Sequence, residues 1–187
     1  MLNNFFDKFI MTNTIRYTHN NFYLLNIPFL IVPLEVLKGL MESQDVDFHR
    51  QIYCIIKKNT REKLLQQFTQ NFGLDKEKEL TLVKDFFTAS GWGNLQIIDM
   101  DIQSKRAIVI TETSPFAEEL KGKTKLPADT LLRGALAGMF SKIFEDDIDC
   151  VEIECEAKGS ERCKFILKPK TTFDFTNKIV QQQLCVE

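Results

Sequence analysis

Several features that would mark a nucleic-acid-binding protein are missing from this sequence. Basic residues do not outnumber acidic ones, since 24 Lys and Arg stand against 26 Asp and Glu in 187 residues. The two signs are also interspersed along the chain. A protein that grips a phosphate backbone usually carries a basic patch. We therefore expect no direct binding of nucleic acid.

Long apolar runs are missing as well. The most apolar stretch, residues 22–37, is interrupted by Asn26, Pro28, Pro33 and Glu35, whereas a membrane helix needs about 20 predominantly apolar residues. The N-terminus lacks the basic segment, the apolar run and the cleavage site of a signal peptide. These observations predict a cytoplasmic protein without a membrane segment. An odd number of cysteines, five, favours thiols or metal ligands over a disulfide framework in that compartment.

Signatures of redox cofactors and nucleotides are scarce. The sequence contains no Gly-x-Gly-x-x-Gly or P-loop pattern and no motif for a flavin, a nicotinamide or an iron–sulfur cluster. The only histidines are His19 and His49, which we interpret as surface or turn residues rather than as haem ligands. No electron donor for a reductase is visible, so we do not expect a self-contained enzyme.

What is present is the composition of an ordinary globular protein, with 44% hydrophobic and 27% charged residues. Periodicity and breakers predict an antiparallel sheet with helices packed on it, an α+β fold. We divide the chain into an N-terminal arm or hairpin (1–30), a small-molecule-binding domain (31–170) and a C-terminal tail (171–187). The expected helices are 33–43, 48–72, 75–90 and 132–143, and the expected hairpins are 14–31, 95–102 with 107–113, and 150–156 with 163–169.

The helix expected at 132–143 has one flank of small residues. Gly134 and Gly138 are four positions apart, so both lie on one side of the helix. This flank either lets another element pack closely or leaves room for a ligand. Arg133, near the helix start, is interpreted as a surface charge, with a pocket cation as the alternative.

Residues with metal-binding chemistry cluster between Cys150 and Cys163. Strand alternation places Cys155 on the same face as Val151 and Ile153, and a turn at Gly159 brings Cys163 beside Cys155. Such a pair is either an inert buried thiol pair or part of a zinc site. The spacing alone leaves these alternatives open.

Three segments together resemble a known family. They are Gly91-Trp92-Gly93, the segment from Leu131 to Gly138, and the segment from Val151 to Phe165. They closely resemble the 4-vinyl reductase domain over residues 80–170, and more loosely its archaeal stand-alone members. The resemblance implies kinship with sensor domains of aromatic-responsive transcription activators, with bacteriochlorophyll vinyl-reduction proteins and with vesicle-tethering subunits.

The resemblance also implies a metal site. In the phenol-sensing relatives zinc is held by a set whose last three members fall on Glu152, Cys155 and Cys163. The first member, a Cys in those relatives, falls on Asp129, whose carboxylate also suits zinc. Glu152 and Cys155 face opposite ways on a regular strand, so this site requires a bulge or twist. Cys150 and Glu154 are fallback ligands.

We therefore expect a sensor or carrier domain for an apolar, aromatic or hydrocarbon ligand, with structural zinc. The candidate ligand-pocket residues are Trp92, Phe86, Tyr53, Leu136, Phe140, Gly134 and Gly138. Residues 22–31 are too apolar to be left uncovered, so we expect a homodimer built partly from the N-terminal hairpin. The alternatives are a vinyl reductase or its accessory acting on a tetrapyrrole, and a protein-interaction scaffold.

Overall fold

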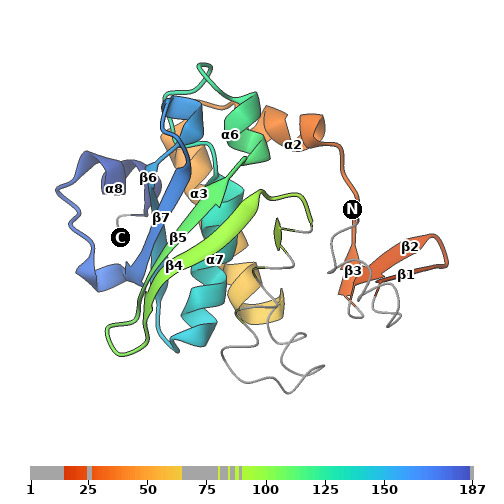
Figure 1. Cartoon of the computed structure of the whole chain (residues 1–187), viewed down its shortest axis with the longest axis horizontal. Coiled ribbons are helices and arrows are strands. Elements are labelled where there is room, and N and C mark those ends of the chain that lie inside the picture. The colour runs from red at the N-terminus through yellow and green to blue at the C-terminus, as the bar shows by residue number, and fades with distance from the viewer. Residues whose placement is uncertain are drawn as a thin grey trace.

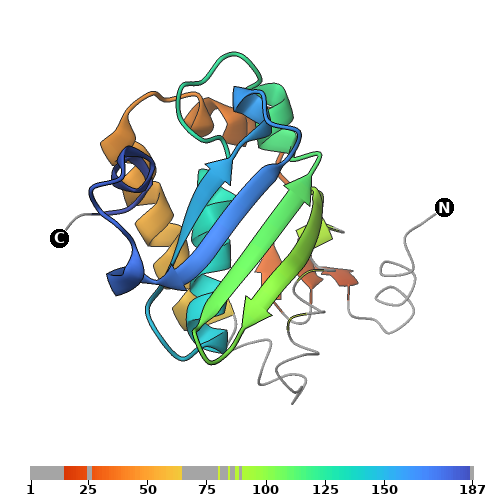
Figure 2. The ribbon, with the colours of Figure 1, turned by 60° about the vertical axis from the view of Figure 1, so that its left-hand side comes forward.

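In the computed structural model, a four-stranded sheet is covered on one face by helices (Figures 1 and 2). The structure describes residues 15–24, 27–64, 80, 84, 87–88 and 90–185. Its strands are β4 (Asn94–Asp101), β5 (Arg106–Glu112), β6 (Ile148–Glu154) and β7 (Cys163–Pro169). They lie in the order β4-β5-β7-β6, and all neighbouring strands are antiparallel. Both expected hairpins of this sheet are confirmed, with bounds shifted by one or two residues.

Two helices form the layer behind the sheet. α7 (Thr130–Ile143) lies against β6 and β7, and α3 (Val46–Asn59) packs on α7. α3 begins where the Asp45 side chain accepts hydrogen bonds from the backbone N–H groups of Asp47 and Phe48, as an N-cap does. The expected helix 48–72 thus starts earlier, and it passes into a π-helical turn, η1 (Thr60–Leu64). Residues 65–72 lie outside the described residues.

Shorter helices connect these layers. α2 (Leu34–Met41) follows Pro33, and α6 (Pro115–Glu119) is capped by the Ser114 hydroxyl. Two 3-10 turns, η2 (Glu156–Lys158) and η3 (Lys170–Thr172), flank β7, and α8 (Lys178–Gln183) packs on α3 and β6. Of the helix expected at 75–90, residues 80, 84, 87 and 88 are helical, and most of the others lie outside the described residues.

The N-terminal hairpin is present and gains a third strand. β1 (Ile15–Thr18), β2 (Asn21–Leu24) and β3 (Ile27–Phe29) form a small antiparallel sheet that stands beside the main body (Figure 1). His19 and Asn20 form the tight turn between β1 and β2, with positive φ angles of 49° and 62°. His19 is therefore a turn residue, as predicted. The α+β architecture with an N-terminal hairpin is confirmed.

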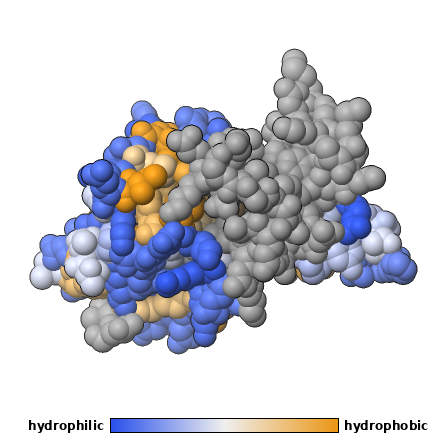
Figure 3. All heavy atoms as spheres, turned by 90° about the horizontal axis from the view of Figure 1, so that it is seen from below, coloured by the Kyte–Doolittle hydropathy of each residue, from blue (hydrophilic) through white to orange (hydrophobic). Residues whose placement is uncertain are grey.

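The surface of the body is mixed in character. On the face shown in Figure 3, hydrophobic residues form small groups between hydrophilic ones. Within the described part of the chain, no helix has the length and apolar character needed to cross a bilayer.

Candidate metal centre and ligand site

The four side chains predicted to bind zinc meet where α7 begins and the β6–β7 hairpin turns. Asp129 immediately precedes α7, Glu152 lies in β6, Cys155 follows β6, and Cys163 is the first residue of β7. All four are buried. Segments that are more than 20 positions apart in sequence therefore contribute to one enclosed cluster.

A strand irregularity brings Glu152 and Cys155 to the same side. The β6–β7 register shifts between Glu152 and Glu154, which is a β-bulge of the kind that the predicted ligand set requires. Ile153 is 38% exposed while Glu152 is buried. The prediction that Ile153 shares the buried face with Cys155 is therefore wrong, because the bulge breaks the alternation.

The sulfur atoms are held in an environment that suits thiolates. One potential ligand atom from each of Glu152, Cys155 and Cys163 lies within 4.8 Å of the others. The backbone N–H of Ala128 donates to Cys155 Sγ at 3.5 Å, and that of Glu156 donates to Cys163 Sγ at 3.3 Å. Hydrogen bonds from backbone N–H groups stabilise negative charge on an acceptor.

The carboxylates have spare acceptor capacity. Asp129 Oδ1 accepts a 2.5 Å hydrogen bond from the Ser114 hydroxyl, and the Asp129 N–H donates to Glu152 Oε2 at 3.2 Å. Asp129 Oδ2 and Glu152 Oε1 are buried without a hydrogen-bond partner among the described residues. Buried polar atoms of native proteins nearly always have a partner, so two orphaned oxygens in one cluster call for an explanation.

The electrostatics of the cluster agree with an excess of negative groups. Burial raises the pKa of Asp129 to about 6 and raises that of Glu152 well above its usual range, and the neighbouring acids add to both effects. A hydrogen bond with Cys163 lowers the pKa of Cys155, while that bond and burial raise the pKa of Cys163. A divalent cation would offset this repulsion. Two thiolates and two carboxylates form a set that zinc accepts.

The fallback ligands lie in other surroundings. Cys150 is buried, with its backbone N–H donating to the Tyr53 hydroxyl. Glu154 forms ion pairs with Lys164 at 3.4 Å and with Arg162 at 3.7 Å. Neither belongs to the group formed by Glu152, Cys155 and Cys163.

The candidate pocket residues on α7 and α3 lie at a tight helix contact. A Cβ atom on Gly134 would lie 2.9 Å from the Tyr53 carbonyl oxygen, and one on Gly138 would lie 2.6 Å from that of Lys57. The small flank of α7 thus accommodates α3 and η1. Leu136 and Phe140 are buried in the core that α7 forms.

The other candidate walls lie at two places. Trp92 packs on the rings of Phe87 and Phe116, and Tyr53 is buried beneath the Arg133 guanidinium, 4.8 Å from its ring centroid. The Phe86 side chain lies outside the described residues. Among the described residues, one hollow of about 460 Å³ is lined by Leu80, Lys84, Asn94, Gln96 and Ile97.

A second hollow, of about 200 Å³, includes Tyr53 together with Cys54, Lys57 and Cys185 in its lining. Trp92, Leu136 and Phe140 line neither of these two hollows. The role of the candidate pocket residues therefore stays a prediction.

Two polar residues interpreted as surface groups are buried. Arg133 is 1% exposed, and its guanidinium donates to the carbonyl oxygens of Cys150 and Gln183. His49 is buried between the Thr130 hydroxyl and the Ser43 carbonyl. For His49 the sequence carries a signal, because His49, Tyr53 and Thr60 follow helical spacing and are all buried.

Comparison with known proteins identifies the domain type. Residues 108–169 match the family model of the 4-vinyl reductase domain, a segment that runs from β5 through β7 and contains all four predicted metal ligands. This match confirms the resemblance to that family which the sequence motifs indicate. No curated protein matches the chain.

Solved structures show the same fold. The phenol-responsive sensory domain of the transcription activator PoxR is similar with a TM-score of 0.73 and 14% identity, covering 95% of each chain. A trafficking protein particle complex subunit 3 from Naegleria fowleri, covalently bound to palmitic acid, has a TM-score of 0.53, 16% identity and coverage of 73% of this chain and 89% of that one. A vinyl-4-reductase family protein from Methanocaldococcus jannaschii has a TM-score of 0.46 and 14% identity, covering 75% and 96%.

Proposed function

We propose that this protein is a ligand-binding sensor or carrier domain for an apolar, aromatic or hydrocarbon molecule. The observation that carries the proposal is the similarity to a phenol-responsive sensory domain over 95% of both chains. That likeness includes the N-terminal sheet and the helical layer as well as the family-matched segment. Ligand sites of this kind are concave and mainly apolar, with few polar groups.

We also propose that a structural zinc ion is held by Asp129, Glu152, Cys155 and Cys163. The two orphaned carboxylate oxygens and the N–H donors aimed at both sulfurs support this assignment. Four protein ligands would leave no position for a reacting water, which is typical of a structural rather than a catalytic zinc. The ion would tie the start of α7 to the β6–β7 hairpin.

A native mass spectrum of the freshly purified chain tests both proposals at once. We expect one zinc ion per chain and, where a ligand survives purification, an additional small molecule. A thermal-shift series with phenols, larger aromatics and hydrocarbons should then show stabilisation, since a ligand at a hundred times its dissociation constant contributes about 2.7 kcal/mol.

The outcomes separate the candidate functions. A hit among aromatic or hydrocarbon compounds supports the sensor or carrier. An absence of hits, combined with binding to a partner protein through an apolar surface, would replace it with the interaction scaffold. Zinc content is read independently, because the metal cluster and the ligand site are different parts of the proposal.

The assembly that we propose is a homodimer in which the N-terminal sheet takes part. Support comes from large apolar side chains that are exposed in and after this sheet, namely Tyr17, Phe29, Leu30, Ile31, Val36 and Leu40. A contiguous set of exposed apolar side chains is commonly covered by a partner. A twofold copy of the same chain is the commonest such partner.

A further inference from the structure

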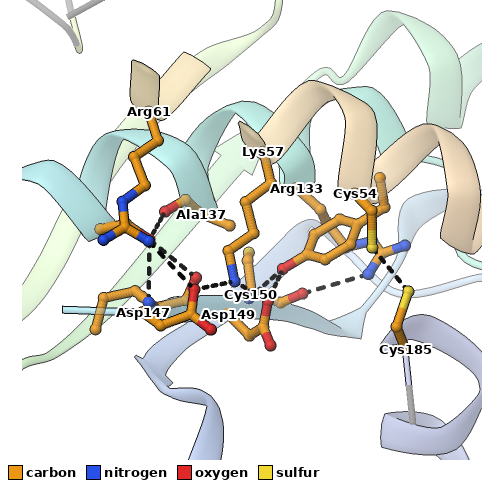
Figure 4. A network of polar contacts seen from close by, with 12 residues as sticks. Cys54, Lys57, Arg61, Arg133, Ala137, Asp147, Asp149, Cys150 and Cys185 are labelled. Carbon is orange, nitrogen blue, oxygen red and sulfur yellow. Dashed lines mark hydrogen bonds and ion pairs between the residues drawn. The ribbon is translucent and has the colours of Figure 1, made fainter. Parts of the chain in front are cut away.

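Two cysteines outside the metal cluster lie in direct contact. Cys54 is on α3 and Cys185 follows α8, and their sulfur atoms are 2.7 Å apart although the residues are 131 positions apart in sequence (Figure 4). A disulfide bond measures about 2.05 Å. A shift of less than about 1 Å would therefore bring the sulfurs to bonding distance.

The position of Cys185 does not depend on the sulfur contact. The Gln183 side chain forms two hydrogen bonds of 2.8 Å with the backbone of Glu152, and the Gln183 carbonyl accepts a hydrogen bond from Arg133. The next residue, Leu184, is fully buried. The segment 178–185, which we call the C-terminal strap, is thus docked by its own contacts, and these contacts bring Cys185 to Cys54.

Both thiols can be reached by a small molecule. Each is partly exposed, and both line the hollow of about 200 Å³ beside α3. Lys57, in the same lining, is held by Asp149 at 2.6 Å and Asp147 at 2.8 Å, so its charge is already paired (Figure 4). Burial and the contact with Cys185 raise the pKa of Cys54 to about 12, so Cys54 stays protonated near neutral pH.

We propose that Cys54 and Cys185 are a redox modification site, at which a reversible disulfide fastens the C-terminal strap to α3. With hydrogen peroxide as the oxidant, the Cys185 thiolate attacks a peroxide oxygen and becomes a sulfenic acid, and hydroxide leaves. Cys54 then attacks the sulfenic sulfur, the S–S bond forms, and the oxygen leaves as water with the Cys54 proton. Overall, two thiols lose two electrons and two protons, and one peroxide becomes two waters.

The disulfide would change the stability of the whole fold. It closes a loop across 131 sequence positions, and closing a long loop removes much conformational freedom from the unfolded chain. Oxidation therefore raises the melting temperature, and reduction by a dithiol restores the original value. The proposal is independent of the zinc proposal, because neither thiol belongs to the predicted ligand set.

The test uses the full chain treated with a small excess of hydrogen peroxide, alkylated and then digested for peptide mass spectrometry. We expect a Cys54–Cys185 linked peptide, an intact mass lower by two hydrogen atoms, and a higher melting temperature, all reversed by dithiothreitol. Cys54→Ser and Cys185→Ser should form no linked peptide, and peroxide should not raise their melting temperature. Cys150→Ser is the matched control that retains the linkage.

Other outcomes would overturn the proposal. If both thiols of the oxidised wild-type chain remain open to alkylation, or if Cys54 or Cys185 links instead to Cys155, Cys163 or a second chain, the assigned pair is wrong. If the linked peptide forms without a rise in melting temperature, the strap is not fastened by it. The peptide map of the wild-type chain gives this answer even if a variant folds poorly.

Discussion

At the scale of single residues, the metal cluster depends on a few atoms that no other part of the described structure satisfies. Asp129 Oδ2 and Glu152 Oε1 are buried and lack hydrogen-bond partners among the described residues. Leaving a buried acceptor unpaired costs about 1–3 kcal/mol, and more when the group is charged. A cation at this point would remove that penalty for both carboxylates.

The first prediction concerns the thiolates. Cys155→Ser should lose stoichiometric zinc, measured by elemental analysis. It should also lower the free energy of unfolding by roughly 3 kcal/mol or more, because a metal that binds only the folded state stabilises it. Cys54→Ser, which alters a thiol outside the cluster, should retain zinc. Wild-type protein purified without chelator and found free of metal would refute the zinc proposal.

The second prediction concerns His49. Burial lowers its pKa below the ordinary 6.5, nearby Arg133 adds to this effect, and the Ser43 carbonyl and Asp45 oppose it. The unfolded chain therefore binds a proton near pH 6.5 that the folded chain resists, so this residue's contribution destabilises the fold as pH falls below about 6.5.

Urea unfolding of the wild type and of His49→Gln between pH 7.5 and 5.5 measures this contribution. The free energy of unfolding should fall more steeply with acid in the wild type than in the variant. Parallel curves for the two proteins would show that His49 does not titrate differently in the folded and unfolded states.

At the scale of elements, the contact of α3 with α7 is set by the two glycines of α7. A side chain at Gly138 would meet the backbone of Lys57 and the side chain of Thr60, at 2.6 and 2.7 Å. Backbone atoms cannot give way as a flexible side-chain end can. The small flank is therefore required by packing, whichever part of the fold binds a ligand.

The third prediction follows from this contact. Gly138→Ala should lower the free energy of unfolding by about 1–3 kcal/mol, because overpacking outweighs the gain in helix propensity. The matched control is Gly39→Ala in α2, where nothing lies within 4 Å of the added Cβ, and it should raise stability by about 0.5–1 kcal/mol. Chemical denaturation of both variants gives the comparison, and equal effects would disprove the packing argument.

At the scale of the whole molecule, the N-terminal sheet stands beside the body and is followed by exposed apolar residues (Figure 1). Leu30 is 81% exposed and Ile31 is 66% exposed. Full burial of such a side chain contributes about 1.5–3 kcal/mol. A few of them in one interface would favour association strongly.

The fourth prediction is that light scattering at micromolar concentration gives the mass of a dimer. Leu30→Asp combined with Ile31→Asp should give a monomer, because two charges would then be desolvated at the interface. Ile102→Asp, at a half-exposed position in the main body, should leave the dimer intact. A monomeric wild type would rule out the homodimer.

Much of the fold was predictable from local pattern. The β4–β5 and β6–β7 hairpins, α7 and the N-terminal hairpin follow from spacing and turn residues, since alternation and helical periodicity report which side of an element is buried. The same reasoning failed at Ile153, because a bulge shifts the alternation by one residue. It also failed at Arg133, where a buried charge is held by backbone carbonyls of distant segments.

The sequence by itself determined the elements and, through its resemblance to a family, the four candidate metal ligands. Only the tertiary structure decided which polar groups are enclosed and which cysteines meet. Cys54 and Cys185 illustrate the difference, because nothing in their local sequence relates α3 to the C-terminal strap. Hydrophobic periodicity acts over a few residues, whereas the meeting of two side chains 131 positions apart depends on how all the intervening elements pack.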